Sequence, residues 1–117
     1  MARVKGGTVT HRRHAKVLEL TRGHRGTKHK LFRRSHESML KALSYAYRHR
    51  RERKRDFRRL WIERINAAAR IEGISYSRLM DGLNKAGVGV NRKILADLAV
   101  RDASAFSRLA EVARTAL

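Results

Sequence analysis

Cysteine and proline are both absent from the sequence. Without cysteine, the chain can form neither a disulfide nor a thiolate zinc site. Proline interrupts helices because it lacks a backbone N–H and clashes with the preceding turn, and an average chain contains roughly 5% of it. Its absence therefore favours an all-α fold with long helices.

Negative charge is scarce: 10 Asp and Glu stand against 29 Lys and Arg, for a formal net charge of +19. The excess lies in the first half. Residues 1–60 hold 20 basic and 4 acidic residues (net +16), and residues 61–117 hold 9 and 6 (net +3). A compact chain this basic repels itself unless an anionic partner neutralises it, which predicts a nucleic-acid partner bound by the first half.

Long apolar segments are missing as well. No run approaches the roughly 20 residues needed to cross a membrane, and no signal-peptide apolar segment follows the charged start. We therefore expect no membrane partner and a soluble protein, in the cytosol or in an organelle that makes it internally.

Residues 31–72 contain neither Gly nor Pro, and we predict one helix from Arg33 to Glu72, about 60 Å long and ended by Gly73. Apolar residues recur at helical spacing toward both ends, at Met39, Leu43, Ala46/Tyr47 and again at Leu60/Trp61, Ile65, Ala68 and Ile71. Between them the helix is charged on all sides, so a partner must stabilise it.

The basic block covers 48–59, where eight of twelve residues are Lys or Arg and seven of those are Arg. Guanidinium groups bind phosphate bidentately and stay charged. A helix that is basic all round can touch several RNA strands, whereas a DNA reader presents one face to one groove. The alternatives are a solvated charge-rich helix and a membrane-surface helix, but the block lacks the apolar face that a membrane helix needs.

A basic-region leucine zipper is disfavoured because Gly73 interrupts the heptad positions Leu60, Ala67 and Ile74. The side chains that we predict to bind RNA are Arg3, Lys5, Arg12, Arg13, Lys16, Arg22, Arg25, Lys28, Lys30, Arg33, Arg34, Arg48, Arg50, Arg51, Arg53, Lys54, Arg55, Arg58 and Arg59.

Several aromatic residues lie beside this charge: Phe32, Tyr45, Tyr47, Phe57 and Trp61. They could stack on unpaired bases or pack in a core. We favour the core for Trp61, which aligns with Ile65, and leave both roles open for Tyr47 and Phe57.

Residues 1–30 are basic and punctuated by glycines. A short helix from His11 to Arg22, ended by Gly23, is predicted, but it has no continuous apolar face. Such a segment buries too little surface to offset its ordering entropy, so we expect it to fold on its partner. The alternative is a flexible tail without a function.

Three short helices are predicted over 74–117, capped by Ser75, Asn91 and Asp102. The residues expected to form one small core are Trp61, Ile65, Ile74, Leu79, Met80, Leu83, Ile94, Leu95, Leu98, Phe106, Leu109, Val112 and Ala113. A domain of this size is near the lower limit for independent folding.

No catalytic constellation stands out: there is no phosphate loop, triad or carboxylate pair, and Gly87-Val88-Gly89 is too short for a dinucleotide loop. All six His lie in the basic half without Cys or carboxylate-rich settings, so no metal site is expected. We expect no enzyme, no cofactor and no small-molecule substrate.

Four stretches carry a family resemblance: MARVKGGTVT at 1–10, AYRHRRERKRDFRRLWIERINAAAR at 46–70, GISYSRLMDGL at 73–83 and NRKILADLAV at 91–100. They resemble the bacterial large-subunit ribosomal protein family named L-twenty, and the similarity covers essentially all 117 residues. One departure is His24, where the family commonly has an aromatic residue, which weakens a base-stacking role there.

The resemblance implies an extended basic N-terminal arm and a long helix that penetrate rRNA, followed by a small C-terminal helical domain that also contacts RNA. It implies direct binding to 23S rRNA, a role in early large-subunit assembly, neighbouring large-subunit ribosomal proteins as partners, and a cytoplasmic location in the ribosome. Some members repress their own messenger RNA. We place the boundary between 1–59, the RNA-binding part, and 60–117, the C-terminal domain.

The competing function class is a non-ribosomal nucleic-acid module, such as an architectural DNA-binding protein. Its electrostatic signature would be the same excess of Lys and Arg. Co-sedimentation with large ribosomal subunits, rather than with nucleoid material, separates the two classes.

Amide exchange tests the predicted dependence on a partner. In the free protein, residues 1–58 should exchange quickly and only about 59–117 should be protected, because the basic half buries too little apolar surface. Hydrogen exchange read residue by residue measures this. Uniform protection in the absence of RNA would contradict coupled folding.

Overall fold

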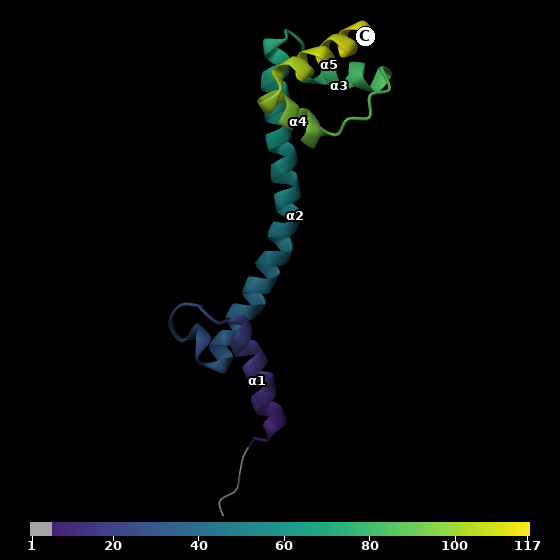
Figure 1. Ribbon diagram of the computed structural model, residues 1–117. Coiled ribbons are helices and arrows are strands. Elements are labelled where there is room, and N and C mark those ends of the chain that lie inside the picture. The colour runs from purple at the N-terminus through teal and green to yellow at the C-terminus, as the bar shows by residue number, and fades with distance from the viewer. Residues whose placement is uncertain (1–5) are drawn as a thin grey trace, which may run out of the picture. The chain divides into compact units, whose positions relative to one another are not determined.

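The computed structural model describes residues 6–117, and every regular element among them is helical (Figure 1). The elements are α1 (Thr8–Leu20), the 3-10 helix η1 (Gly26–His29), α2 (Phe32–Ile71), α3 (Tyr76–Lys85), α4 (Arg92–Arg101) and α5 (Ala103–Thr115). The predicted all-α fold, with a long helix followed by smaller ones, is confirmed. Arg3 and Lys5 lie outside the described residues.

The chain divides into two units, Met1–Arg51 and Glu52–Leu117, and the division falls within α2. The boundary predicted between Arg59 and Leu60 concerns where dependence on RNA ends, and it stays a prediction.

Helix α2 has 40 residues and matches the predicted helix to within one residue at each end. Gly73 has a φ of +72°, which is the left-handed conformation that glycine adopts most readily. Its N–H donates to the Arg70 carbonyl at 3.0 Å, and the Ile74 N–H donates to the Ala69 carbonyl at 2.9 Å. These two bonds form a Schellman motif, so the predicted glycine C-cap is confirmed.

The three predicted N-caps are also confirmed. Ser75 Oγ accepts from the Arg78 N–H at 3.4 Å, and Asn91 Oδ1 accepts from the Ile94 N–H at 3.0 Å. Asp102 Oδ1 accepts from the Ala105 N–H at 2.9 Å and from the Ser104 hydroxyl. The Ser104 hydroxyl, followed by the Ala105 N–H, lowers the pKa of Asp102, because both stabilise its ionised form.

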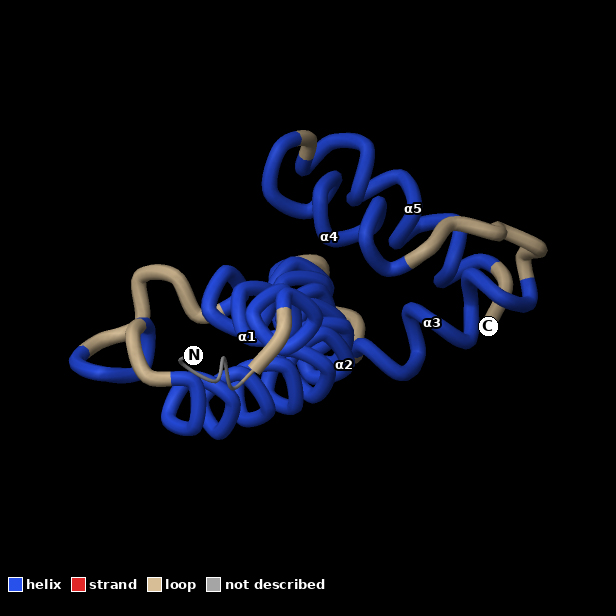
Figure 2. Tube along the Cα trace, turned by 90° about the horizontal axis from the view of Figure 1, so that it is seen from below, coloured by secondary structure: helices blue, strands red, loops and turns tan. Residues whose placement is uncertain are grey.

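In the second unit, α5 packs on α3 and on α4 (Figure 2). The hydrophobic core that they enclose also includes Ile65 and Ala69 from the last turns of α2. Its fully buried large side chains include Ile65, Leu79, Leu83 and Leu95. Trp61 is half-buried and packs against this core, as predicted. The remaining core residues are Ala69, Ile74, Ala96, Phe106, Ala110 and Ala113.

Part of the predicted core was wrong. Ile94 and Val112 are 50% and 41% exposed, and Leu98 is half-buried but outside the core cluster. Ile71, which follows the helical spacing of α2, is 86% exposed. On α4 the buried face is formed by Leu95 and Ala96 instead, which turns Ile94 outward.

Small residues allow the short helices of the second unit to pack closely. Ala96, Ala110 and Ala113 are buried, and Gly82 of α3 lies against the backbone of α5. A Cβ built on Gly82 would lie 2.8 Å from both the Cα and the carbonyl carbon of Ala113, and closer still to its oxygen. Backbone atoms cannot move aside as a flexible side chain can, so α3 and α5 approach each other only because residue 82 has no side chain.

The first unit is held differently. Among its described residues, only Thr21 and Ser35 are buried, and both are polar. The Thr21 hydroxyl donates to the carbonyls of Val17 and Leu18, and the Ser35 hydroxyl donates to the Lys28 carbonyl at 2.6 Å. Helix α1 begins three residues before the predicted start and ends two before the predicted end.

Replacing Gly82 with Ala should lower the free energy of unfolding of the second unit by about 3 kcal/mol, because the new methyl group collides with the α5 backbone. Gly89→Ala is the matched control, since no heavy atom lies within 4 Å of the added Cβ and its φ is not left-handed. Urea unfolding followed by circular dichroism measures both. Equal stability of the two variants would contradict the close approach.

Candidate nucleic-acid interface

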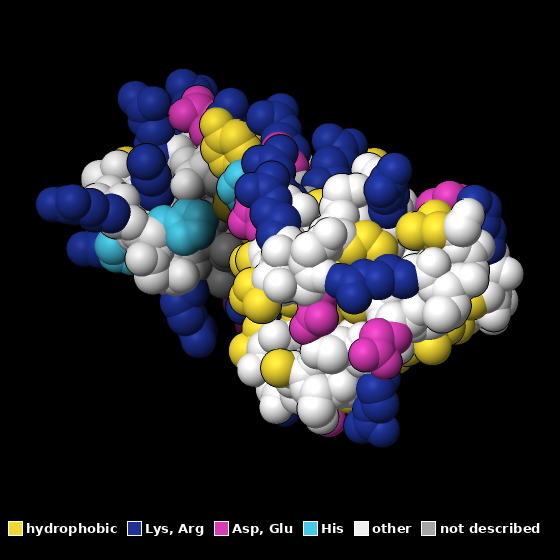
Figure 3. Space-filling model, turned by 90° about the horizontal axis from the view of Figure 1, so that it is seen from above, with side chains coloured by type: hydrophobic (Ala, Val, Ile, Leu, Met, Phe, Trp, Pro, Cys, Tyr) yellow, Lys and Arg dark blue, Asp and Glu magenta, His cyan; other side chains and the backbone are white. Residues whose placement is uncertain are grey.

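The predicted RNA-binding side chains that the structure describes are all exposed. Helix α1 carries Arg12, Arg13 and Lys16, the segment between α1 and α2 carries Arg22, Arg25, Lys28 and Lys30, and α2 carries Arg33, Arg34, Arg48, Arg50, Arg51, Arg53, Lys54, Arg55, Arg58 and Arg59. Figure 3 shows Lys and Arg side chains standing out from the surface and outnumbering Asp and Glu. Their exposure leaves them open to an anionic partner.

The basic part of α2 has almost no support from other parts of the protein. From Leu40 to Leu60 every residue is exposed except Ala46. Even Tyr47 and Phe57 are 56% and 48% exposed. A helix in this state has no packed face that would stabilise it in water, and the need for a partner stays a prediction.

Two tyrosines organise cations along this helix. The Arg51 Nη2 donates to the Tyr47 hydroxyl at 2.6 Å, and its guanidinium carbon lies 4.5 Å from the centre of the Tyr47 ring. The Lys41 Nζ and the Arg48 guanidinium carbon lie 5.0 and 5.9 Å from the centre of the Tyr45 ring. Each contact restrains a long side chain, which would reduce the entropy lost on binding an anion.

Sequence reasoning missed Lys41. It is exposed on α2 and lines a groove of about 480 Å³ together with Lys28, Arg34, Glu37, Ser38 and Ala42. Arg34 forms an ion pair with Glu37 at 3.4 Å in the same groove. The sequence feature that could have indicated Lys41 is its spacing of one helical turn from Tyr45. Lys41 was not predicted because it lies outside the basic block.

Histidine side chains make several of the contacts that hold the segment before α2. The His14 ring stacks on Phe32 with centroids 3.8 Å apart. His24 Nδ1 lies 2.8 Å from the Ser38 hydroxyl, and His29 Nδ1 donates to the His24 carbonyl at 2.6 Å. Within residues 6–117, no group of three or more His, Asp or Glu side chains could hold a metal ion.

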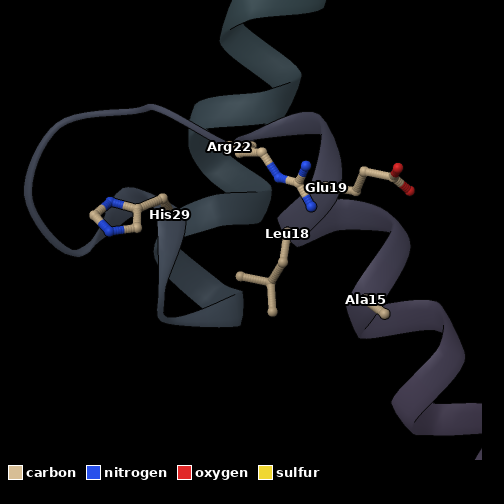
Figure 4. A pocket seen from close by; sticks show the side chains of 5 residues that line it. All are labelled: Ala15, Leu18, Glu19, Arg22 and His29. Carbon is tan, nitrogen blue, oxygen red and sulfur yellow. The ribbon is translucent and has the colours of Figure 1, made fainter.

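A second hollow of about 610 Å³ lies beside α1 and is lined by Ala15, Leu18, Glu19, Arg22 and His29 (Figure 4). The Glu19 carboxylate and the His29 ring point away from each other in this view, to opposite sides of Leu18 and Arg22. Because these polar groups do not converge, the hollow does not have the geometry of a catalytic site.

Comparison with known proteins identifies the family. The family model described as "Ribosomal protein L20" matches residues 3–109. The chain belongs to the ribosomal protein L20 family. The predicted family resemblance is thereby confirmed, and as a member of a ribosomal protein family the chain is not an enzyme.

Individual relatives of the ribosomal protein L20 family match over nearly their whole length. A protein of Brevibacillus brevis named "Large ribosomal subunit protein bL20" is 61% identical over 117 residues, covering 100% of this chain and 98% of the relative. A protein of the same name from Dehalococcoides mccartyi is 60% identical over 116 residues, covering 99% and 98%. One from Heliobacterium modesticaldum is 61% identical over 114 residues, covering 97% and 96%.

In the described part of the chain, no helix combines the length and the apolar character that crossing a membrane requires.

Proposed function

We propose that the chain is a structural component of the large ribosomal subunit that binds 23S rRNA directly and promotes early assembly of that subunit in the cytoplasm. The observation that supports this most is the run of exposed cations on an unsupported helix, from Arg48 to Arg59, in a member of the L20 family. Its partners are 23S rRNA and neighbouring large-subunit ribosomal proteins.

The mechanism is charge neutralisation coupled to ordering. Each phosphate that a Lys or Arg neutralises releases condensed counterions, which drives binding. The cations of the basic block surround α2, so RNA segments on different sides of the helix are held at the same time. Bringing distant segments together early is what assembly of a large RNA requires.

The first unit adds to this interface in the proposal. Its described part buries no apolar residue. Little free energy therefore holds it folded in water, and it orders when it binds RNA. The nineteen predicted basic residues, with Lys41 added, are the proposed phosphate contacts.

A non-ribosomal DNA-binding role fits the geometry less well. Readers of DNA place one helix face in one groove. Here Arg50, Arg51, Arg53 and Arg55 are all exposed, and at 100° per residue they point in different directions around α2.

Replacing these four arginines with Gln should weaken binding to 23S rRNA and flatten its salt dependence. The slope of log affinity against log salt should fall in magnitude by roughly 3, because each lost phosphate contact removes about 0.7–0.9. Filter binding across a salt series measures the slope.

The matched control removes the same charge from α3 and α5 through Arg78→Gln, Lys85→Gln, Arg108→Gln and Arg114→Gln, all at exposed positions. Its slope should change less. If the block variant keeps the wild-type slope, the basic block is not the phosphate site.

The protein should sediment with large ribosomal subunits in a sucrose gradient and remain with them through a high-salt wash, because buried contacts are screened less than surface ones. Immunoblotting of gradient fractions measures this. Migration with nucleoid material instead would overturn the ribosomal role.

A further inference from the structure

A cleft in the second unit is not used by the core and is separate from the basic block. It has a volume of about 620 Å³ and lies between α2 and α4. Trp61, Ile94 and Leu98 supply its apolar lining, and Arg64, Lys93 and Arg101 supply cations around it. Cations and apolar side chains of the second unit therefore meet in this cleft.

The apolar lining consists of side chains of α4 and α2 that are not fully buried in the core. Ile94 is 50% exposed, and Leu98 is half-buried without joining the core cluster. They are four residues apart, so they are neighbours on one face of α4. Trp61 packs against the core and also lines the cleft, which leaves a large aromatic side chain supported from behind and accessible in front.

The charges favour an anionic ligand. Arg64 and Lys93 are exposed, while Arg101 is held by Asp97 at 2.9 Å. Asn91 also lines the cleft, and its Oδ1 is occupied by the α4 cap while its amide N–H₂ can still donate. An apolar floor with cations and a few polar groups at its edge is the usual construction of a site for a flat anionic ligand.

We propose that this cleft binds one unpaired nucleotide of RNA, with its base against Trp61, Ile94 and Leu98 and its phosphate facing Arg64 and Lys93. The proposal rests on the proposed RNA-binding function and adds to it a site for a flipped-out base. Bases stack on aromatic side chains irrespective of their identity, so the site needs no particular sequence.

An acidic peptide is the competing occupant, and the cleft suits it less. Extended peptides gain much of their affinity from backbone hydrogen bonds to a sheet edge. The cleft is bordered by the helices α2 and α4, so it offers no sheet edge to an extended peptide. An aromatic platform beside two cations matches a base and its phosphate directly.

The test uses the full chain and compares Ile94→Glu with Val100→Glu. Both residues are exposed and apolar on α4, at 50% and 66%, and only Ile94 lines the cleft. Both variants add the same charge, and neither removes a core side chain. Circular dichroism and thermal unfolding confirm that both fold.

Trp61 is the one tryptophan of the chain, so its fluorescence reports on this cleft. Adenosine monophosphate should quench it saturably in the wild type and in Val100→Glu, with at least about tenfold weaker apparent affinity in Ile94→Glu. Inorganic phosphate should leave the emission unchanged, because it has no base to stack. Affinity for 23S rRNA should also fall more in Ile94→Glu than in Val100→Glu.

Equal quenching by phosphate and adenosine monophosphate, or equal affinities in the two variants, would overturn the nucleotide site. Quenching by pentaglutamate that depends on Ile94, without a response to adenosine monophosphate, would assign the cleft to an acidic peptide instead. The same measurements separate this proposal from the proposed function. If the wild type does not bind 23S rRNA, the proposed function is wrong. If the wild type binds and the two variants bind with equal affinity, only the nucleotide site is wrong.

Discussion

Repulsion among closely spaced cations on a helix without tertiary packing is the constraint on which the rest of the structure depends. Between Leu40 and Leu60 almost nothing covers α2, and eight of the twelve residues of 48–59 are basic. Like charges three and four residues apart destabilise a helix in water. In the proposed function, an anionic partner supplies the stabilisation that other helices gain from a core, and the exposed arginines are the groups that would bind it.

The second unit provides the protein-based anchor for this helix. α2 enters a core at Trp61 and Ile65, and the Gly73 Schellman motif turns the chain into α3. Close packing of Gly82 on Ala113 lets three short helices form a core in few residues. In the first unit, hydrogen bonds from Thr21 and Ser35 and the His14–Phe32 stack replace such a core. The two units thus differ in what holds them, and this difference follows the distribution of charge.

Much of the fold could be predicted from particular residues. The absence of Gly and Pro over 31–72 predicted α2 to within a residue, and Ser75, Asn91 and Asp102 marked the helix starts because their side chains bond to the first free N–H groups. The candidate site was predictable insofar as it consists of exposed Lys and Arg. Lys41 was not predicted because the feature that distinguishes it is its contact with the Tyr45 ring. Ile94 was wrongly assigned to the core because a short helix with apolar residues at 94, 95 and 98 could bury more than one of its faces.

The sequence by itself determined the helical class, the ends of α2, the starts of α3, α4 and α5, and the concentration of positive charge, because propensity, capping and composition are local properties. Only the tertiary structure decided which apolar residues are buried in the core and which remain exposed. Gly82 lets α3 and α5 approach closely, and α4 buries Leu95 and Ala96 while Ile94 stays exposed. Which face a helix buries depends on how closely helices approach each other, a property of pairs of elements distant in the chain, and Ile94 is left to line the cleft beside Trp61.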